Sequence, residues 1–298
     1  MNVLITGGTG FIGKVLCKRL LAEGHSLFIL TRRPENVMGQ VKAISQLSEL
    51  PESSEASRID AVINLAGEPI ANKRWSVKQK ELIISSRLDT TRKLIDYFKE
   101  VTHLPSVFIS GSAIGYYGAG VSNEVHKEDA PGDDSFSSKL CQQWESTALE
   151  AEGMGIRTCL LRTGIVLGKD GGALSKMLLP FKLGLGGRVG RGDQWMPWIH
   201  VDDLVSIILH CIDNESLSGP LNGTAPSPVS NSAFSRELAR ALRRPALFPL
   251  PAFVVRLLMG EMGEELLLSG KRIVPAKLLH SGFDFQYESL PVALRNIV

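Results

Sequence analysis

The segment Leu4–Gly13, LITGGTGFIG, places a glycine-rich turn between two apolar stretches. Residues 2–6 form a short apolar run that ends at the glycines, which is typical of a buried parallel strand. Apolar side chains at helical spacing over about residues 11–22 predict a helix directly afterwards. The turn between this strand and this helix contains three evenly spaced glycines, Gly7, Gly10 and Gly13.

A glycine-rich turn in this position is a common binding site for a dinucleotide. Glycine lets backbone N–H groups approach a pyrophosphate, and the positive end of the helix dipole faces the negative charge. The spacing G-x-x-G-x-x-G differs from the commoner G-x-G-x-x-G, but the strand–turn–helix context supports the same function. We therefore predict a dinucleotide site rather than a turn that serves packing alone.

The first half of the chain continues to alternate strand and helix patterns. Apolar runs at residues 26–31, 60–67, 106–112 and 157–168 predict further strands. Helical patterns cover about residues 77–99 and 137–152. Repeated strand–helix–strand units predict an α/β protein with a Rossmann-type, doubly wound parallel sheet, in which ligands bind at the carboxyl ends of the strands.

The regular alternation of strand and helix patterns ends after Gly168. We predict that residues 1–168 form the dinucleotide-binding domain, to which residues 198–223 return with one more helix and strand. Residues 169–197 and 224–298 then form a small C-terminal α/β lobe for the substrate. Within it, the apolar segment 250–263, LPAFVVRLLMGEMG, is predicted to pack inside the lobe or to form a homodimer surface.

Composition narrows the class of partner. Of the 298 residues 44% are hydrophobic, and 33 basic against 31 acidic residues give a net charge of +2, without a basic arm that would favour nucleic acid. No apolar stretch is long enough to span a bilayer. The four scattered cysteines predict reduced, buried thiols in a cytoplasmic protein. We therefore expect a small-molecule substrate rather than a nucleic acid or a membrane.

The second predicted strand indicates which dinucleotide is bound. A site for NAD places an acidic residue about 20 residues after the glycines, where it accepts a hydrogen bond from the ribose 2′-hydroxyl. Here the strand ends in Arg32 and Arg33 instead. Because guanidinium groups suit a phosphate, we predict NADP(H). The alternative is a pair of solvated arginines at a strand end.

The segment WIHVDDLV, residues 198–205, contains a histidine and two aspartates. Their spacing fits no common metal site, so we predict no metal there. Instead, Asp202 is expected to cap a helix at residues 202–211, and His200 to orient the loop before it.

Several motifs together resemble a known family. TGGTGFIG (6–13), NLAGEP (64–69), SGSAIGYYG (110–118), LRTGIVLG (161–168) and WIHVDDLV occur in the order and spacing of extended short-chain dehydrogenases/reductases, the NAD(P)-dependent epimerase/dehydratase group. The stretches 71–91 and 272–297 resemble one subgroup, bacterial proteins described as sugar-nucleotide epimerases or as cell-division-inhibitor-like. Members of this subgroup have a small C-terminal domain of unknown function.

The resemblance implies roles for individual residues. Around the pyrophosphate it places Gly7, Thr9, Gly10, Phe11, Ile12 and Gly13, and at the adenosine 2′-phosphate Arg32 and Arg33. Beside the riboses it places Leu65, Ala66 and Gly67, beside the nicotinamide Ser110 and Ser112, and at the carboxamide end the stretch Arg162–Ile165. It also implies an oxidoreductase or epimerase acting on a secondary alcohol, with a nucleotide sugar as the family's commonest substrate class.

The sequence departs from the family at its catalytic pair. The family uses Tyr-x-x-x-Lys, in which the lysine holds the cofactor ribose and the tyrosine exchanges a proton with the substrate. Lys139 aligns with the lysine, but Ser135 stands four residues earlier, with Phe136 beside it. Neither residue is a phenolic acid or base, and a serine hydroxyl needs a base to activate it.

Three hypotheses remain open for the proton transfer. Tyr116 or Tyr117 could serve, because both follow Ser112, although they could equally be a packed aromatic pair. Glu68 or Arg87 could serve, Arg87 lying near the place where extended members keep an asparagine. Otherwise the protein binds NADP(H) as a redox sensor or a partner-binding module and transfers no hydride. We favour the enzyme, because Ser112 and Lys139 are retained.

Overall fold

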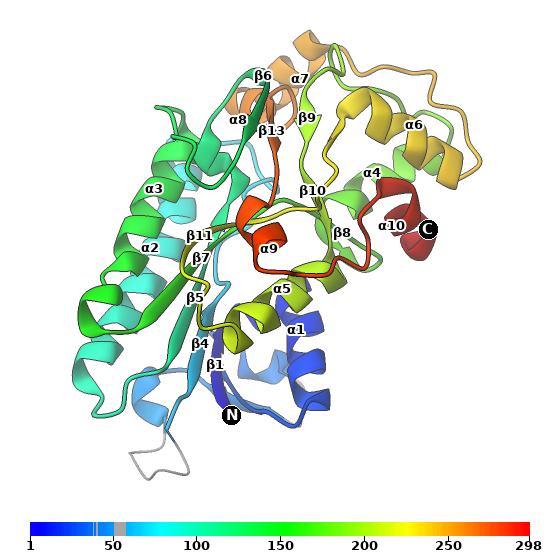
Figure 1. Cartoon of the computed structure of the whole chain (residues 1–298). Helices are drawn as coiled ribbons and strands as arrows, with labels where there is room; N and C mark the ends of the chain where they lie inside the picture. Colours follow the sequence, from blue (N-terminus) through cyan, green and yellow to red (C-terminus); the bar gives the residue numbers. More distant parts are fainter. Residues whose placement is uncertain (38, 40, 51–57) are drawn as a thin grey trace.

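A computed structural model describes residues 1–37, 39, 41–50 and 58–298 (Figure 1). In this part of the chain, seven parallel strands form the central sheet in the order β11-β7-β5-β4-β1-β2-β3. The strands are β1 (Asn2–Thr6), β2 (Ser26–Leu30), β3 (Lys42–Ile44), β4 (Ala61–Asn64), β5 (Val107–Ala113), β7 (Arg157–Thr163) and β11 (Gly219–Gly223). The predicted Rossmann-type, doubly wound sheet is confirmed.

Helices cover both faces of the sheet (Figure 1). On one face lie α1 (Phe11–Ala22) and α5 (Val201–Asp213), and on the other α2 (Val77–Glu100) and α3 (Phe136–Leu149). Successive strand residues alternate between the two cores: Val3 and Ile5 pack on the first side, and Leu4 packs on the second with Phe98. Because both faces are buried, the central strands β1, β2 and β4 are largely apolar, and these strands were recognisable in the sequence. The short edge strand β3 was not predicted.

The chain order reverses between β1 and β4, which are neighbours in the sheet. From β1 the chain winds outward through β2 to β3, and from β4 it winds the other way to β11. Such a reversal opens a crevice beyond the carboxyl ends of the strands. The glycine-rich turn after β1 and the segment 65–68 after β4 both lie at this crevice.

Two predicted elements are divided in the structure. The segment 157–168, expected to be a strand and its exit, contains two strands, β7 and β8 (Ile165–Gly168). The chain leaves the central sheet at Gly164, and β8 pairs with β10 (Trp198–His200). The apolar segment 250–263 is two helices, α7 (Ala252–Met259) and α8 (Glu261–Leu266), separated at Gly260, whose φ is +59°.

The remaining strands and helices surround the upper edge of the sheet (Figure 1). Two further small sheets pair β6 (Val121–His126) with β13 (Gly270–Ile273) in parallel, and β9 (Trp195–Met196) with β12 (Val229–Ser230) antiparallel. The helices here are α4 (Gly172–Lys182), α6 (Asn231–Ala241), α9 (Ala276–His280) and α10 (Leu290–Ile297). Short 3₁₀ turns are η1 (Pro34–Asn36), η2 (Leu47–Glu49), η3 (Ile114–Tyr117) and η4 (Glu152–Met154).

The C-terminal elements dock directly on α2 and α3. Lys80 of α2 pairs with Glu261 of α8 at 2.6 Å. Met262 packs in a cluster with Trp75 and Leu140. These contacts place the C-terminal segment beside the amino end of α3, where it takes part in the site described below. The predicted division at residues 168, 198 and 224, and the homodimer surface on 250–263, stay predictions.

The start of α5 differs from expectation. The residue at its N-cap position is His200, whose Nδ1 accepts a hydrogen bond from the N–H of Asp202 at 3.2 Å. The prediction that Asp202 caps the helix was therefore wrong. The next residue, Asp203, accepts hydrogen bonds through its carboxylate from the N–H groups of Gln286 and Tyr287, both at 2.9 Å. Asp203 thereby holds the C-terminal segment against α5.

All four cysteines are free and buried, as predicted. In the described parts of the chain no helix has the length and apolar character that crossing a membrane requires. Within the same residues, no three His, Cys, Asp or Glu side chains converge as a metal site requires.

Candidate cofactor and substrate site

The glycine-rich turn has the geometry of an anion site. Gly10 stands at the N-cap of α1, and its N–H donates to the carbonyl oxygen of Gly7 at 2.9 Å. Gly7 has φ +72°, a conformation that side chains rarely allow. A Cβ on Gly13 would lie 2.3 Å from the Gly7 oxygen, so α1 approaches the turn as closely as the backbone permits. The first turn of α1 contains no acidic residue, which leaves its positive end open to an anion.

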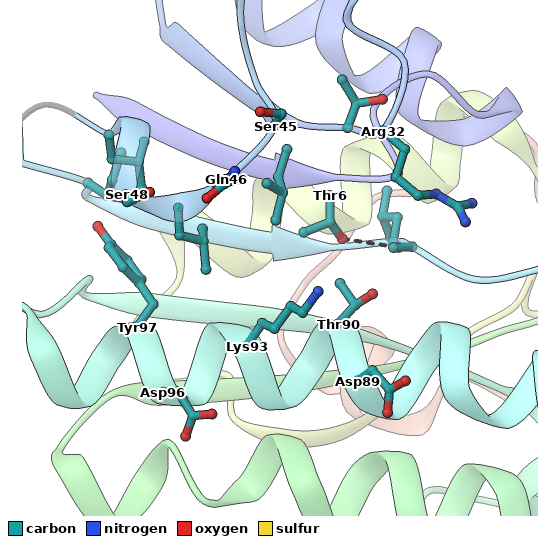
Figure 2. Close-up of a pocket in the computed structure, with 18 of the residues that line it drawn as sticks. Thr6, Arg32, Ser45, Gln46, Ser48, Asp89, Thr90, Lys93, Asp96 and Tyr97 are labelled. Atoms are coloured by element: carbon teal, nitrogen blue, oxygen red, sulfur yellow. Dashed lines mark hydrogen bonds between the residues drawn. The ribbon is translucent and has the colours of Figure 1, made fainter.

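A cleft of about 1220 Å³ extends from this turn along the crevice (Figure 2). It brings together eight of the predicted cofactor residues: Gly7, Thr9, Gly10, Arg32, Leu65, Ala66, Gly67 and Glu68. Arg32 extends from the end of β2 and forms no hydrogen bond or ion pair with the described residues (Figure 2). Its neighbour Arg33 is exposed outside the cleft lining, and its N–H donates to the Thr31 hydroxyl.

Sequence reasoning missed the opposite wall of the cleft. One polar face of α2 forms it, and the residues on this face include Ser86, Thr90, Lys93 and Tyr97. Figure 2 shows Thr90, Lys93 and Tyr97 along the helix face that looks toward the strand ends. These residues recur every three or four positions, which is the spacing of one helix face. That pattern is present in the sequence, but a polar helix face is as common on a solvated helix as on a ligand site.

A second pocket, of about 350 Å³, lies beyond the cleft between β5, α3 and the C-terminal segment. Among the predicted residues it is lined by Ile12, Leu65, Arg87 and Ser112. Thr163, Gly164 and Ile165, from the stretch predicted at the carboxamide end, also line it, as does Trp195. Residues that sequence reasoning did not assign to a site complete the pocket, and they include Ser137, Cys141, Trp144, Glu265 and Lys271. Leu65 belongs to both pockets, so the cleft and the pocket are adjacent.

Arg87 lies where the cleft and the pocket meet. Its Nη1 donates to the backbone oxygens of Glu68 at 3.1 Å and Ile83 at 3.0 Å. The guanidinium packs against Gly67, where a Cβ would lie 2.9 Å from its Cζ, and lies 5.3 Å from the Trp144 ring centroid. Burial lowers the pKa of Arg87, and charge interactions with Cys141 and Glu68 oppose that shift.

Ser112 belongs to a buried ionic network behind the pocket. Its hydroxyl donates to Glu145 at 2.6 Å, and Glu145 in turn pairs with Arg162 through two hydrogen bonds of 2.8 and 2.9 Å. Burial disfavours the charge of Arg162, but hydrogen bonds and charge interactions with Glu145 and Tyr117 together outweigh burial and raise the pKa of Arg162. Arg162 therefore anchors the network and does not line either pocket.

The two tyrosines pack beside this network. The Tyr117 hydroxyl donates to Asn222 at 2.6 Å and accepts from Arg162 at 3.0 Å. Burial raises the pKa of Tyr117 to about 12. The Tyr116 ring lies 3.4 Å from the Arg162 guanidinium carbon. Neither tyrosine lines the pocket, so the structure places both as a packed aromatic pair rather than at the pocket surface.

Helix α3 presents Ser137 and Cys141 to the pocket, not Ser135 and Lys139. Lys139 is exposed, and its ammonium lies 3.3 Å from Asp134. Ser137 and Cys141 have the same spacing of four residues but lie on the buried face. Burial, followed by the charge of Glu145, raises the pKa of Cys141 to about 11, so its thiol is protonated at neutral pH.

The other predicted residues support the turn and the sheet. Phe11 packs against Gly168 and Gly171, where a Cβ would lie 2.6 and 2.7 Å from its ring. Ser110 is fully buried in β5, and its hydroxyl donates to the neighbouring Gly111 oxygen at 3.4 Å. Phe11, Ser110 and Gly13 therefore lie behind the surface of the two pockets and line neither.

Comparison with models of known families shows which family the chain belongs to. Residues 3–221 match the model of the NAD dependent epimerase/dehydratase family, and residues 250–297 match DUF1731, a domain of unknown function. The chain belongs to the NAD-dependent epimerase/dehydratase family. The resemblance inferred from the sequence motifs is therefore confirmed, and the fold is the NAD(P)-binding Rossmann fold of this family.

Relatives within the epimerase/dehydratase family match over the full length. Epimerase family protein YfhF of Bacillus subtilis is 39% identical, with 100% of this chain and 98% of that protein covered. Mouse epimerase family protein SDR39U1 is 40% identical, with both chains covered completely. A crystal structure of human SDR39U1 (isoform 2) with NADPH has a TM-score of 0.90 at 36% identity, covering 100% of this chain and 99% of that one.

Proposed function

We propose that the protein is an NADP(H)-dependent oxidoreductase or epimerase that acts on a secondary alcohol or a carbonyl compound in the second pocket. The observation that carries this proposal is Arg32. This cation, unpaired among the described residues, stands at the end of β2 in a cleft whose glycine-rich turn suits a pyrophosphate. The structure of human SDR39U1 with NADPH supports the same cofactor.

The residues present fit a nicotinamide dinucleotide. The open amino end of α1 would bind the pyrophosphate, and Arg32 would bind the 2′-phosphate. Leu65 and Ile12 would place the nicotinamide end at the junction of cleft and pocket. When bound, this cofactor supplies or accepts a hydride. The apolar lining of the second pocket, which includes Trp144 and Trp195, limits access of water there.

The first experiment is a calorimetric titration with NADPH and with NADH. We expect at least tenfold tighter binding of NADPH, because a phosphate gains charge-assisted hydrogen bonds from a guanidinium. Arg32→Asp should weaken NADPH binding at least tenfold and change NADH binding much less. Arg92→Asp is the matched control, because Arg92 is exposed on α2 and lies outside the cleft lining. Equal affinities for the two cofactors, or equal losses in the two variants, would refute the assignment.

A non-catalytic NADP(H)-binding protein is the second candidate. The position of Tyr117 favours it, because this hydroxyl is buried against Asn222 and Arg162. The exposure of Lys139 points the same way. Loading the protein with NADP⁺ and adding pooled cytosolic metabolites separates the candidates. Fluorescence of reduced cofactor should rise for an enzyme, and should stay flat with bound NADP⁺ for a sensor or binding module.

A further inference from the structure

The second pocket has hydrogen-bond donors without partners among the described residues. Arg87 uses only Nη1 for protein hydrogen bonds, and its Nε and Nη2 make none with the described residues. The Ser137 hydroxyl is buried and also has no partner among these residues. A buried polar group without a partner costs about 1–3 kcal/mol, so the Ser137 hydroxyl indicates a partner that a ligand supplies. Arg87 is only partly buried, so its Nε and Nη2 are accessible to donate to the same ligand. Both residues line the same pocket.

The carboxylates at the pocket already accept hydrogen bonds. The Glu265 oxygens accept from the backbone N–H groups of Phe136 and Ser137, at 3.1 and 3.0 Å. Behind the pocket wall, Glu145 is held by Arg162 and Ser112. The remaining titratable groups at the pocket are Cys141, a protonated thiol, and the cation Lys271. Within the described part of the chain, the pocket therefore offers donors to a ligand and no free carboxylate base.

Resting on the proposed function, we propose that this pocket reduces a carbonyl compound with NADPH, its oxygen bound by Arg87 and Ser137, and does not epimerise an alcohol. Epimerisation needs a base to take the hydroxyl proton in its first half. In reduction, a hydride from NADPH forms the new C–H bond while the C=O π electrons move to oxygen. Arg87 stabilises the resulting alkoxide, which takes a proton from water and leaves hydroxide in solution, and NADP⁺ is released.

The lining indicates the class of carbonyl compound. Apart from the groups named above, the walls are largely apolar and aromatic, with Leu140, Trp144, Trp195 and Leu266 among them. The volume of about 350 Å³ lies near the lower end of ligand pockets, roughly 300–1,000 Å³. Because the nicotinamide end shares this space, a small aromatic or aliphatic aldehyde or ketone fits it. A charged nucleotide sugar does not match these walls.

The binding test uses two probes with one ring, benzamide and benzylamine. Benzamide presents a carbonyl oxygen that hydride does not reduce, whereas benzylamine presents a cationic donor. Added to the protein–NADPH complex and followed by nicotinamide fluorescence, benzamide should bind at least tenfold more tightly. Arg87→Met and Ser137→Ala should each weaken benzamide at least fivefold. Arg92→Met, an exposed position on the same helix, should not. Equal binding of both probes, or unchanged affinity in both variants, overturns the proposal.

The rate test follows benzaldehyde with NADPH and benzyl alcohol with NADP⁺ between pH 6 and 9. We expect benzaldehyde reduction, and benzyl alcohol oxidation that is slow at pH 7 and rises about tenfold per pH unit without a plateau, because hydroxide from solvent rather than a pocket carboxylate takes the alcohol proton. No reduction, or a plateau below pH 8, overturns the proposal. A plateau that Glu68→Gln removes would identify the base as Glu68, which faces Arg87 from the cleft.

The experiments distinguish a failure of the proposed function from a failure of the carbonyl-reduction proposal. Cofactor affinity is measured first by calorimetry on the same proteins. If NADPH does not bind, the proposed function fails. If NADPH binds and either probe experiment gives the opposite result, only the carbonyl-reduction proposal fails. Ser137→Ala removes a single hydroxyl and keeps the backbone N–H that donates to Glu265, so this variant should fold when Arg87→Met does not.

Discussion

Glu145→Ala tests the buried ionic network behind the pocket. Glu145 and Arg162 are both almost fully buried, with side-chain exposures of 7% and 3%. Removing the carboxylate leaves the Arg162 cation with only the Tyr117 hydroxyl and the Glu128 backbone oxygen as hydrogen-bond partners among the described residues. Breaking a buried pair from one side costs about 3–5 kcal/mol. At about 2 °C per kcal/mol for a chain of this size, we expect Tm to fall by roughly 6–10 °C.

Urea and thermal unfolding of a graded set of variants measure this cost. Glu145→Gln keeps the shape of the side chain and loses its charge. The free energy of unfolding of this variant should therefore lie between those of the wild type and Glu145→Ala. The double variant Glu145→Met with Arg162→Met removes both charges and should cost less than Glu145→Ala alone. Glu150→Ala, exposed at the end of the same helix, should stay within about 0.5 kcal/mol. A loss below about 1 kcal/mol for Glu145→Ala would refute the reasoning.

Three further changes have defined outcomes. Gly13→Ala places a Cβ 2.3 Å from the Gly7 oxygen and should weaken NADPH binding at least tenfold by calorimetry, whereas Gly153→Ala, with open space around it, should not. Burial raises the folded-state pKa of Tyr117 to about 12, so unfolding free energy should fall as pH rises from 10 to 12, by roughly 2–3 kcal/mol; a Phe at this position should abolish that fall. Glu265→Ala should speed hydrogen exchange at the backbone amides of Phe136 and Ser137, which donate to Glu265. Unchanged exchange would contradict the inference that this carboxylate holds the amino end of α3.

The central sheet was predictable because its signals are local. The strands β1, β2 and β4 are short apolar runs that end at a turn with glycine or polar residues. β3 lies in a polar segment without such a run, and it was not predicted. The cofactor turn is equally local, since Gly7 to Gly13 form one contiguous stretch whose conformation depends on backbone geometry. The position of Arg32 in the cofactor cleft was predictable for the same reason, because Arg32 lies two residues after Leu30, the last residue of β2.

The residues at the second pocket were harder to predict, because the rotation of α3 about its axis decides which of its side chains face the pocket. Ser135 and Lys139 have the same spacing as Ser137 and Cys141, so spacing alone does not choose between them. A shift of two residues turns a side chain by about 200° around a helix with 3.6 residues per turn. The structure places the later pair at the pocket and Lys139 in solvent. Only packing of α3 against α2 and β5 fixes this rotation.

The sequence by itself determined the sheet, the glycine-rich turn and the family, because these depend on short-range patterns. Tertiary structure alone decided which groups meet at the pocket. The contacts between Glu145 and Arg162, and between Glu265 and the amino end of α3, join residues far apart in the chain. Their partners depend on how helices and the C-terminal segment pack, since a charged residue in isolation shows no preference for one distant partner over another.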